Sequence, residues 1–209
     1  MAITNGYATL AQVKSALNIT DTVDDAILEV AIEAASREID GFTGRVFYTV
    51  GTSSRFFTPQ SGDFCAIDDA ISISEVATVG SVFGTYDAVW ANPSAGNNNG
   101  DYQTEPLNAT YPVNGIVQPI TGLRAIYQNY FPIIGDTATV KVTGSWGWSA
   151  VPTAIKQATI IQASRVFKRK DSPLGVAGFG DFGAMRVSGS IDADVRQLIE
   201  PYRLVRTIA

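Results

Sequence analysis

The sequence contains no histidine, and this absence excludes several kinds of active site. Ser-His-Asp and Cys-His catalytic arrangements depend on an imidazole, and the common zinc sites use histidine beside cysteine. Cysteine is almost absent as well. The single Cys65 allows no internal disulfide, and its apolar neighbours predict a small core residue. We therefore expect no catalytic residues, no cofactor and no metal site.

Long hydrophobic runs are missing too. Although 45% of the 209 residues are hydrophobic, no apolar stretch approaches the roughly 18 residues needed to cross a membrane. The N-terminal segment lacks the basic and apolar regions of a secretory signal. We therefore expect a globular protein that is made in the cytoplasm and has no membrane partner.

The net charge of −5 conceals an uneven distribution. Residues 1–150 hold 6 Lys/Arg and 15 Asp/Glu, whereas residues 151–209 hold 9 and 5. Free nucleic-acid-binding proteins usually have a net basic domain, and this chain as a whole does not. The asymmetry fits an acidic part of one copy meeting a basic part of a neighbour, a head-to-tail contact that can close into a ring. Uneven charge on a solvated surface is the alternative.

Two helices are predicted near the N-terminus. Thr9 and Gln12 have the spacing of a capping box, which predicts a helix over 10–17. A second helix is predicted over 23–42, and Gly44 is expected to end it. This helix has a wide apolar arc that we expect to be buried and that includes Ile27, Val30 and Ala34. It also has an acidic stripe, which is either a solvated face or a contact with a neighbouring subunit. The stripe consists of Asp25, Glu29, Glu33 and Asp40.

Two further helices are predicted near the C-terminus. Pro152 suits the first position of a helix over 152–170, and Asp192 is expected to cap a final helix over 193–203. The longer of the two carries two apolar faces. The second face packs either against another subunit or within the chain. The two faces consist of Ala154, Ile155, Ala158, Ile161 and Val166, and of Ile160, Ala163 and Phe167.

A basic group and a glycine-rich loop follow the 152–170 helix. Lys168, Arg169 and Lys170 suit a helix C-terminus, and they are candidates for contact with DNA or with an acidic protein surface. The glycines of residues 175–183 follow a helix and not a strand, which argues against a nucleotide-binding loop.

The section between these helical ends is rich in β-branched and aromatic residues. It predicts a mostly antiparallel sheet or barrel, with a turn at Asp68-Asp69 and one or two long surface loops between Trp90 and Gly122. The fold class is thus α+β. We expect N-terminal helices over 1–45, a β-rich section over 46–148 and C-terminal helices over 149–209, with the two helical parts forming one domain. The predicted strands cover 54–58, 64–67, 71–79, 86–90, 124–130 and 137–143.

Two other functions fit parts of this sequence. Trp90, Trp146 and Trp148 with the long loops are compatible with a β-sandwich module that binds a ligand such as a carbohydrate. A carboxylate-based hydrolase would require two of its acidic residues to converge in a cleft. The candidates are Asp63, Asp68, Asp69 and Asp101.

Several segments resemble the head-to-tail adaptor, or head-tail connector, family of long-tailed bacteriophages. The resemblance extends over residues 7–48 and 140–203. The segments that carry it are YATL at 7–10, DDAIL at 24–28, AASREID at 34–40, TGR at 43–45, GSWGW at 144–148, VP at 151–152, IKQA at 155–158, FKRKDSP at 167–173, GFG at 178–180 and the stretch 195–203.

This resemblance implies a virion structural protein without catalysis, located at the head-tail interface and assembled in the bacterial cytoplasm. It implies a dodecameric ring under the portal that joins capsid to tail and continues the DNA channel, through which DNA passes without sequence-specific binding. The implied partners are the portal, further copies of the chain and a downstream stopper or tail terminator. With this family in mind, the interface residues are Ile160, Phe167, Lys168, Arg169, Lys170, Phe179, Phe182, Tyr202 and Arg203, with Phe179 and Phe182 as anchors of the glycine-rich loop.

Overall fold

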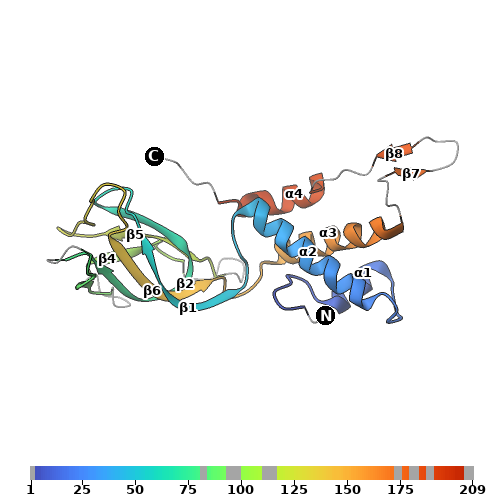
Figure 1. Cartoon of the computed structure of the whole chain (residues 1–209), viewed down its shortest axis with the longest axis horizontal. Coiled ribbons are helices and arrows are strands. Elements are labelled where there is room, and N and C mark those ends of the chain that lie inside the picture. Colours follow the sequence, from blue (N-terminus) through green and yellow to red (C-terminus); the bar gives the residue numbers. More distant parts are fainter. Residues whose placement is uncertain are drawn as a thin grey trace. The chain divides into compact units, whose positions relative to one another are not determined.

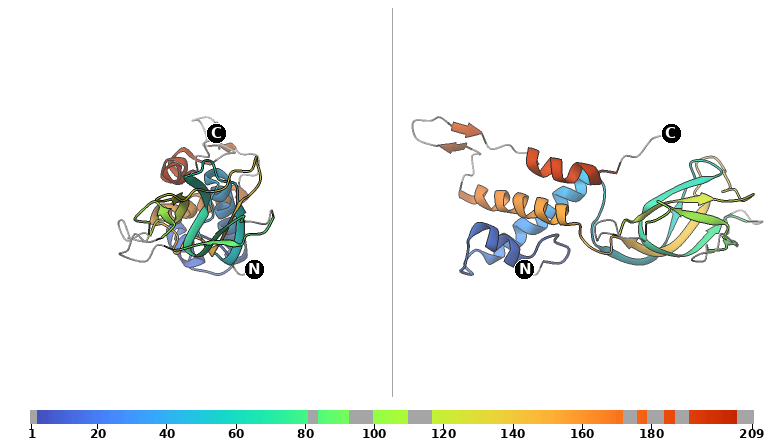
Figure 2. Two further views of the ribbon diagram at one scale, coloured as in Figure 1. Left: turned by 90° about the vertical axis from the view of Figure 1, so that its left-hand side faces the viewer. Right: turned by 180° about the vertical axis from the view of Figure 1, so that it is seen from behind.

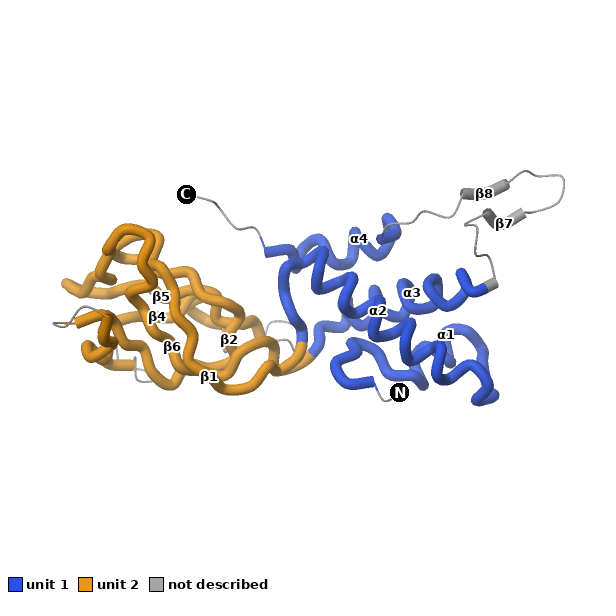
Figure 3. The backbone as a smooth tube through the Cα atoms, viewed as in Figure 1, with its two compact units in different colours: residues 1–47, 151–206 blue, residues 48–150, 207–209 orange. Residues whose placement is uncertain are grey.

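The chain forms two compact units (Figure 3), each of which is described by itself. The helical unit comprises residues 1–47 and 151–206, and the β unit comprises residues 48–150 and 207–209. Helices and an antiparallel sheet together confirm the predicted α+β class. This computed structural model describes residues 3–80, 84–92, 100–109, 117–171, 176–178, 184–186 and 191–204.

The helical unit is built around α3, which contacts α1, α2 and α4 (Figure 1). This arrangement confirms that the N-terminal and C-terminal helices pack together. Among the described residues, no helix combines the length and the apolar character needed to span a membrane. The helices are α1 (Leu10–Leu17), α2 (Asp25–Thr43), α3 (Thr153–Lys168) and α4 (Ala193–Ile199), with 3₁₀ turns at η1 (Arg169–Asp171) and η3 (Glu200–Tyr202).

Local sequence explains where several helices begin and end. The Thr9 side chain accepts a hydrogen bond from the Gln12 N–H while the Gln12 side chain accepts from the Thr9 N–H, so the predicted capping box is confirmed. Gly44 ends α2 with a φ of 68°, in the left-handed region that glycine adopts without strain. Pro152 precedes the first residue of α3 and does not occupy it.

Both apolar faces of α3 are covered within the chain. Ile155 and Ala158 are buried on one face, and Ala163 and Phe167 are buried on the other. The second face packs into a core with residues of α1 and α2, including Val13, Leu28 and Ile32. Because α4 also contacts α3, α3 is the central helix of its own unit. The second face is therefore covered within the chain except at Ile160, which is half-buried.

The β unit is a six-stranded sheet in which every recorded pairing is antiparallel. The strand order is β1-β6-β2-β5-β4, and β3 pairs with β2. The strands that come first and last along the chain, β1 and β6, pair with each other, and Thr49 lies opposite Gly147. The strands are β1 (Thr49–Phe57), β2 (Phe64–Thr78), β3 (Ala88–Trp90), β4 (Tyr102–Glu105), β5 (Ile120–Ala125) and β6 (Val140–Gly147).

The predicted turn at Asp68-Asp69 is wrong, because β2 continues through it. Adjacent residues of a strand point to opposite faces, and each carboxylate finds a different partner there. Asp68 lies 2.8 Å from the Arg55 guanidinium, and Asp69 accepts a hydrogen bond of 2.8 Å from the Trp148 indole N–H. Two acidic residues side by side suggested a turn, but long-range partners hold them in a strand.

The β-unit core contains the aromatic residues that could have formed an exposed binding platform. Trp146 and Trp148 are buried, and the half-buried Trp90 ring stacks on Phe131 with centroids 4.6 Å apart. Cys65 is buried there, as predicted. The tryptophans therefore give no support to a carbohydrate site. β4 and the start of β5 lie within a region that was predicted to consist of loops.

Candidate functional site

An apolar surface runs along the outside of α2, on the side away from α3. Its large side chains are Val23, Ile27 and Val30, which are 86%, 47% and 57% exposed. Ile27 and Val30 follow helical spacing, so they lie on one face of α2, and Val23 lies in the turn just before the helix. This surface, called the α2 outer face below, consists of Val23, Ala26, Ile27, Val30, Ala34 and Gly41, all of them exposed.

Sequence reasoning missed this surface, because it assigned Ile27, Val30 and Ala34 to the buried arc of the helix. A signal was present in the sequence. The apolar arc extends over about half the circumference of α2, which is more than one packing surface needs. The exposed large hydrophobic residues of the helical unit, within the described ranges, all lie on this one face.

The predicted acidic stripe borders the α2 outer face and is largely engaged within the chain. Asp25 forms an ion pair of 2.6 Å with Lys14, which joins α2 to the end of α1. Glu33 accepts hydrogen bonds from the backbone N–H groups of Thr4 and Asn5, at 2.6 and 3.2 Å. These carboxylates fasten the N-terminal segment to α2. Contact of the stripe with another subunit stays a prediction.

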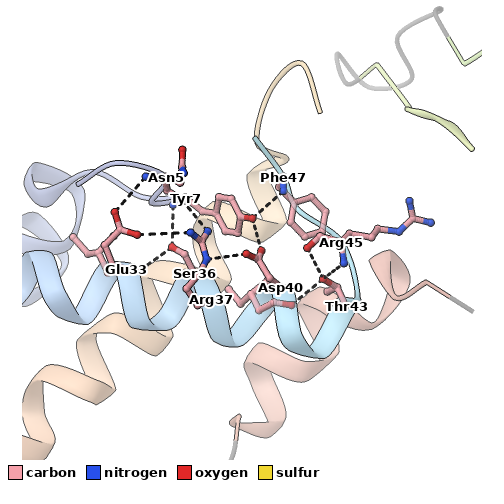
Figure 4. A network of polar contacts seen from close by, with 11 residues as sticks. Asn5, Tyr7, Glu33, Ser36, Arg37, Asp40, Thr43, Arg45 and Phe47 are labelled. Atoms are coloured by element: carbon pink, nitrogen blue, oxygen red, sulfur yellow. Dashed lines mark hydrogen bonds and ion pairs between the residues drawn. The ribbon is translucent and has the colours of Figure 1, made fainter. Parts of the chain in front are cut away.

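Asp40, the last residue of the stripe, belongs to a buried polar network (Figure 4). The Tyr7 hydroxyl donates to Asp40 and accepts a hydrogen bond of 2.9 Å from the Phe47 N–H. The Tyr7 N–H donates to the Ser36 hydroxyl at 3.1 Å. Burial raises the pKa of Tyr7 above its ordinary range, and burial likewise raises the pKa of Asp40, although Tyr7 and Arg37 oppose this second shift.

Arg37 is the one charged residue that projects within the bounds of the α2 outer face. Its guanidinium lies 2.8 Å from Asp40 and 3.8 Å from Glu33, and it donates to the Asn5 carbonyl at 3.0 Å. The cation is therefore neutralised by its own helix. As a result, the face has no strong charge of either sign.

The three residues of the predicted basic group at the end of α3 have different surroundings. Lys170 forms an ion pair of 2.7 Å with Asp24, and its ammonium lies 4.2 Å from the centroid of the buried Phe167 ring. These two predicted interface residues thus contribute to the fold of the helical unit. Lys168 is exposed and Arg169 is half-buried. Whether the group faces protein or DNA stays a prediction.

A second surface, called the α3 outer face below, lies on the solvent side of α3. Lys156, Gln157 and Lys168 are exposed on it, and Ile160 and Ile161 are half-buried. Ile160, a predicted interface residue, also packs against the core formed with α1 and α2. The α3 outer face consists of Thr153, Lys156, Gln157, Ile160, Ile161, Ser164 and Lys168.

The remaining predicted interface residues lie near the C-terminus. The Tyr202 ring meets Phe47 edge-on at 5.7 Å, and the Arg203 guanidinium lies 5.6 Å from the Phe42 ring. Tyr202 is half-buried and Arg203 is exposed, and of these two contacts only that of Arg203 is with α2. β7 (Val176–Gly178) and β8 (Ala184–Arg186) form an antiparallel pair. Phe179 and Phe182 lie outside the described residues.

The described residues contain no group of three His, Cys, Asp or Glu side chains placed to hold a metal ion. The four carboxylates considered for a hydrolase have separate partners. Asp63 pairs with Arg124 at 3.1 Å, and Asp101 accepts hydrogen bonds from the Ala91 N–H and the Asn129 amide. Asp68 and Asp69 have the partners given above.

Part of the chain matches a known protein family. Residues 7–78 match the family model described as phage gp6-like head-tail connector protein. The match begins at Tyr7 and includes α1, α2 and the first two strands. It confirms the resemblance inferred from the N-terminal motifs, whereas the motifs over residues 140–203 lie outside the match. No curated protein matches the chain.

Solved structures with a similar fold come from gene transfer agent (GTA) particles. A chain from the neck of a native GTA particle, computed with C12 symmetry, is 20% identical with a TM-score of 0.54, and the match covers 100% of this chain and 94% of that one. A chain from the neck of an empty GTA particle, computed with C6 symmetry, is 19% identical with a TM-score of 0.53 over 100% and 95%. These likenesses show a shared fold over the whole chain.

Proposed function

We propose, from the family match of residues 7–78, that this chain is the head-to-tail adaptor of a phage-like particle. It forms a ring beneath the portal, joins the capsid to the tail and continues the channel through which DNA passes. Its partners are the portal, further copies of itself and a stopper or tail terminator on the tail side. It works by contact alone and binds DNA without sequence specificity.

The fold of the whole chain supports this proposal in addition to the family match. Chains of similar fold, aligned over 100% of this one, occur in GTA necks that were solved with rotational symmetry. An exposed apolar helix face without a strong charge is what a protein subunit needs in order to pack against another protein.

Removal of the gene from a strain that produces the particles tests the proposed function. Heads should still fill with DNA, but they should lack tails, and a wild-type copy should restore tailed particles. Electron microscopy and mass spectrometry of purified necks would score the result. Tailed, DNA-delivering particles at normal yield without the chain would contradict the proposal.

Cross-linking of intact necks tests the partners separately. If the chain lies between portal and tail, lysine cross-links should join it to the portal protein on one side and to a tail-side protein on the other. Links to major capsid protein alone would argue against an adaptor, even if the chain is present in the particle.

A further inference from the structure

We infer that, in the ring of the proposed function, the α2 outer face of one copy packs against the α3 outer face of the next. This inference rests on the proposed function and specifies how the ring closes. A ring of identical subunits requires two different surfaces on each copy, because the contact is head-to-tail. The helical unit offers two such surfaces.

The two surfaces point to opposite sides of the helical unit. α2 packs on α3, and α2 lies in front of α3 in Figure 1 and behind it in the reverse view of Figure 2. The side of each helix away from the other therefore faces outward in opposite directions. Surfaces on opposite sides allow each copy to contact a neighbour on both sides, as a ring requires.

The chemistry of the two surfaces also matches. The exposed Val23, Ile27 and Val30 of the α2 outer face need an apolar partner, and the half-buried Ile160 and Ile161 on α3 provide one. Ala26, Ala34 and Gly41 leave little side-chain bulk between helices, so the neighbouring helix can approach α2 closely.

Charges at the edges reinforce this pairing. Lys156 and Lys168 are exposed on the α3 outer face. Glu33 and Glu38 lie on the two borders of the α2 outer face, each partly exposed. Each is hydrogen-bonded within the chain, Glu33 to the Thr4 N–H and Glu38 to the Gln162 amide at 2.6 Å, and keeps its negative charge. In the inferred contact, cations at the rim of one surface would approach these carboxylates, which favours correct register more than it adds affinity.

Another copy of the chain fits the α2 outer face better than DNA does. DNA binding depends on cations that neutralise phosphates, and the one cation on this face, Arg37, is paired with Glu33 and Asp40. The face is a single stripe along one helix, and a stable free dimer needs roughly 800 Å² from each partner. We therefore expect the contact to persist only where the ring holds the copies in place.

Paired cysteines provide the direct test. The chain should be changed at Val30→Cys and Gln157→Cys together, and at each position alone, and necks should be purified from particles that contain the variants. A short thiol-specific cross-linker is then added. Burial raises the pKa of the native Cys65 thiol to about 12, so this cysteine contributes no background reaction near neutral pH.

The double variant should give a ladder of cross-linked multimers, whereas each single variant should give none. A Val89→Cys and Gln157→Cys pair is the matched control, since Val89 is as exposed as Val30 but belongs to the β unit. No ladder from the double variant, in necks that contain the chain, would overturn this inference and leave the proposed function intact. Dimers from Val30→Cys alone would also overturn it, because two α2 faces would then meet. Absence of the wild-type chain from purified necks would overturn both this inference and the proposed function.

Val30→Glu provides a second measurement. Val30 is exposed, so the free subunit should keep its helical circular dichroism, while tailed particles should fall at least tenfold when this variant replaces the wild type. Val89→Glu should change neither. Normal tailing with Val30→Glu would overturn the inference, because a charge cannot be buried in an apolar contact without large cost.

Discussion

At the scale of single residues, the Tyr7 hydroxyl is the clearest test of what holds the N-terminal segment in place. Tyr7→Phe removes one group that both donates to Asp40 and accepts from the Phe47 N–H. The two partners stay in a partly buried site, so we expect the helical unit to lose about 1–3 kcal/mol of stability.

Urea unfolding followed by far-ultraviolet circular dichroism would measure this loss, because all three tryptophans lie in the β unit and do not report on the helices. Tyr130→Phe is the control, since Tyr130 is 69% exposed. An unchanged unfolding midpoint for Tyr7→Phe would mean that the network contributes nothing to stability.

The raised pKa of Asp40 makes the stability of the helical unit depend on pH. Burial raises its pKa above the ordinary value of 3.8, so the folded state favours the protonated form more than the unfolded state does. The stabilising contribution is complete below pH 3.8 and is lost as the pH rises through the folded pKa. Relative to Asp40→Asn, the wild type should therefore lose stability between pH 3.8 and neutrality.

Urea titrations of both proteins across this pH range would check the sign. Asp194→Asn, at an exposed position of α4, serves as the control. The prediction would be refuted if the free energy of unfolding of the wild type rose relative to that of Asp40→Asn as the pH increased toward neutrality.

These residues also show what sequence can predict. The capping box of Thr9 and Gln12 was predictable, because both residues belong to one turn. The contact of Tyr7 with Asp40 joins residues 33 positions apart, and no local pattern encodes it. Likewise, the segment YATL at 7–10 carries the family resemblance, but the sequence does not indicate that the Tyr7 hydroxyl contacts Asp40.

At the scale of elements, the GSWGW motif can be explained by the joining of β1 and β6. Gly147 has a φ of 95°, and a Cβ added there would lie 2.0 Å from the Tyr48 carbonyl oxygen. Gly147→Ala should therefore destabilise the β unit by more than about 3 kcal/mol, through backbone strain and steric clash together.

The control is Gly51→Ala. Gly51 has a φ of 109°, but an added Cβ meets nothing within 4 Å, so only the conformational cost of about 1 kcal/mol applies. Tryptophan fluorescence during urea unfolding reports on the β unit directly. Equal losses for the two variants would show that contact with Tyr48 is unimportant.

Elements differed in how well the sequence predicted them. α1 and α2 were predicted within two residues at each end, since capping and periodicity are local signals. β2 was predicted as two strands because Asp68 and Asp69 resemble a turn. Their partners are Arg55 of β1 and Trp148, which directly follows β6, so no local pattern reveals them. The exposure of the α2 outer face was missed because periodicity identifies an apolar face without saying what covers it.

At the scale of the whole molecule, the charge distribution changes when it is counted by folded unit. Residues 1–47 and 151–206 contain 12 Lys/Arg and 12 Asp/Glu, whereas residues 48–150 contain 3 and 8. The helical unit is thus neutral and the β unit carries −5. An attraction between oppositely charged parts no longer explains a contact between helical units, and the apolar α2 outer face explains it better.

This difference predicts how salt affects the ring. Apolar contacts are not weakened by salt, whereas charge attractions are screened within about 3 Å at 1 M. Purified necks should therefore retain the chain in about 1 M sodium chloride, and the free chain should be monomeric in low and high salt alike. Sedimentation and light scattering would test both statements. Release of the chain by salt, or a stable free dimer, would contradict them.

The pairing of β1 with β6 at Thr49 and Gly147 has a consequence for how such a chain can evolve. Because the N–H of Trp148 donates to the Tyr48 carbonyl at 3.3 Å, the β unit leaves the helical unit and returns to it at neighbouring points. A segment with adjacent ends can be gained or lost in one genetic event without altering the surrounding helices.

Replacement of residues 49–147 by a short Gly-Ser linker should therefore yield a folded helical protein, as circular dichroism would show. By the same logic, a lineage of such proteins can exchange the β unit for another while it keeps the helical unit unchanged.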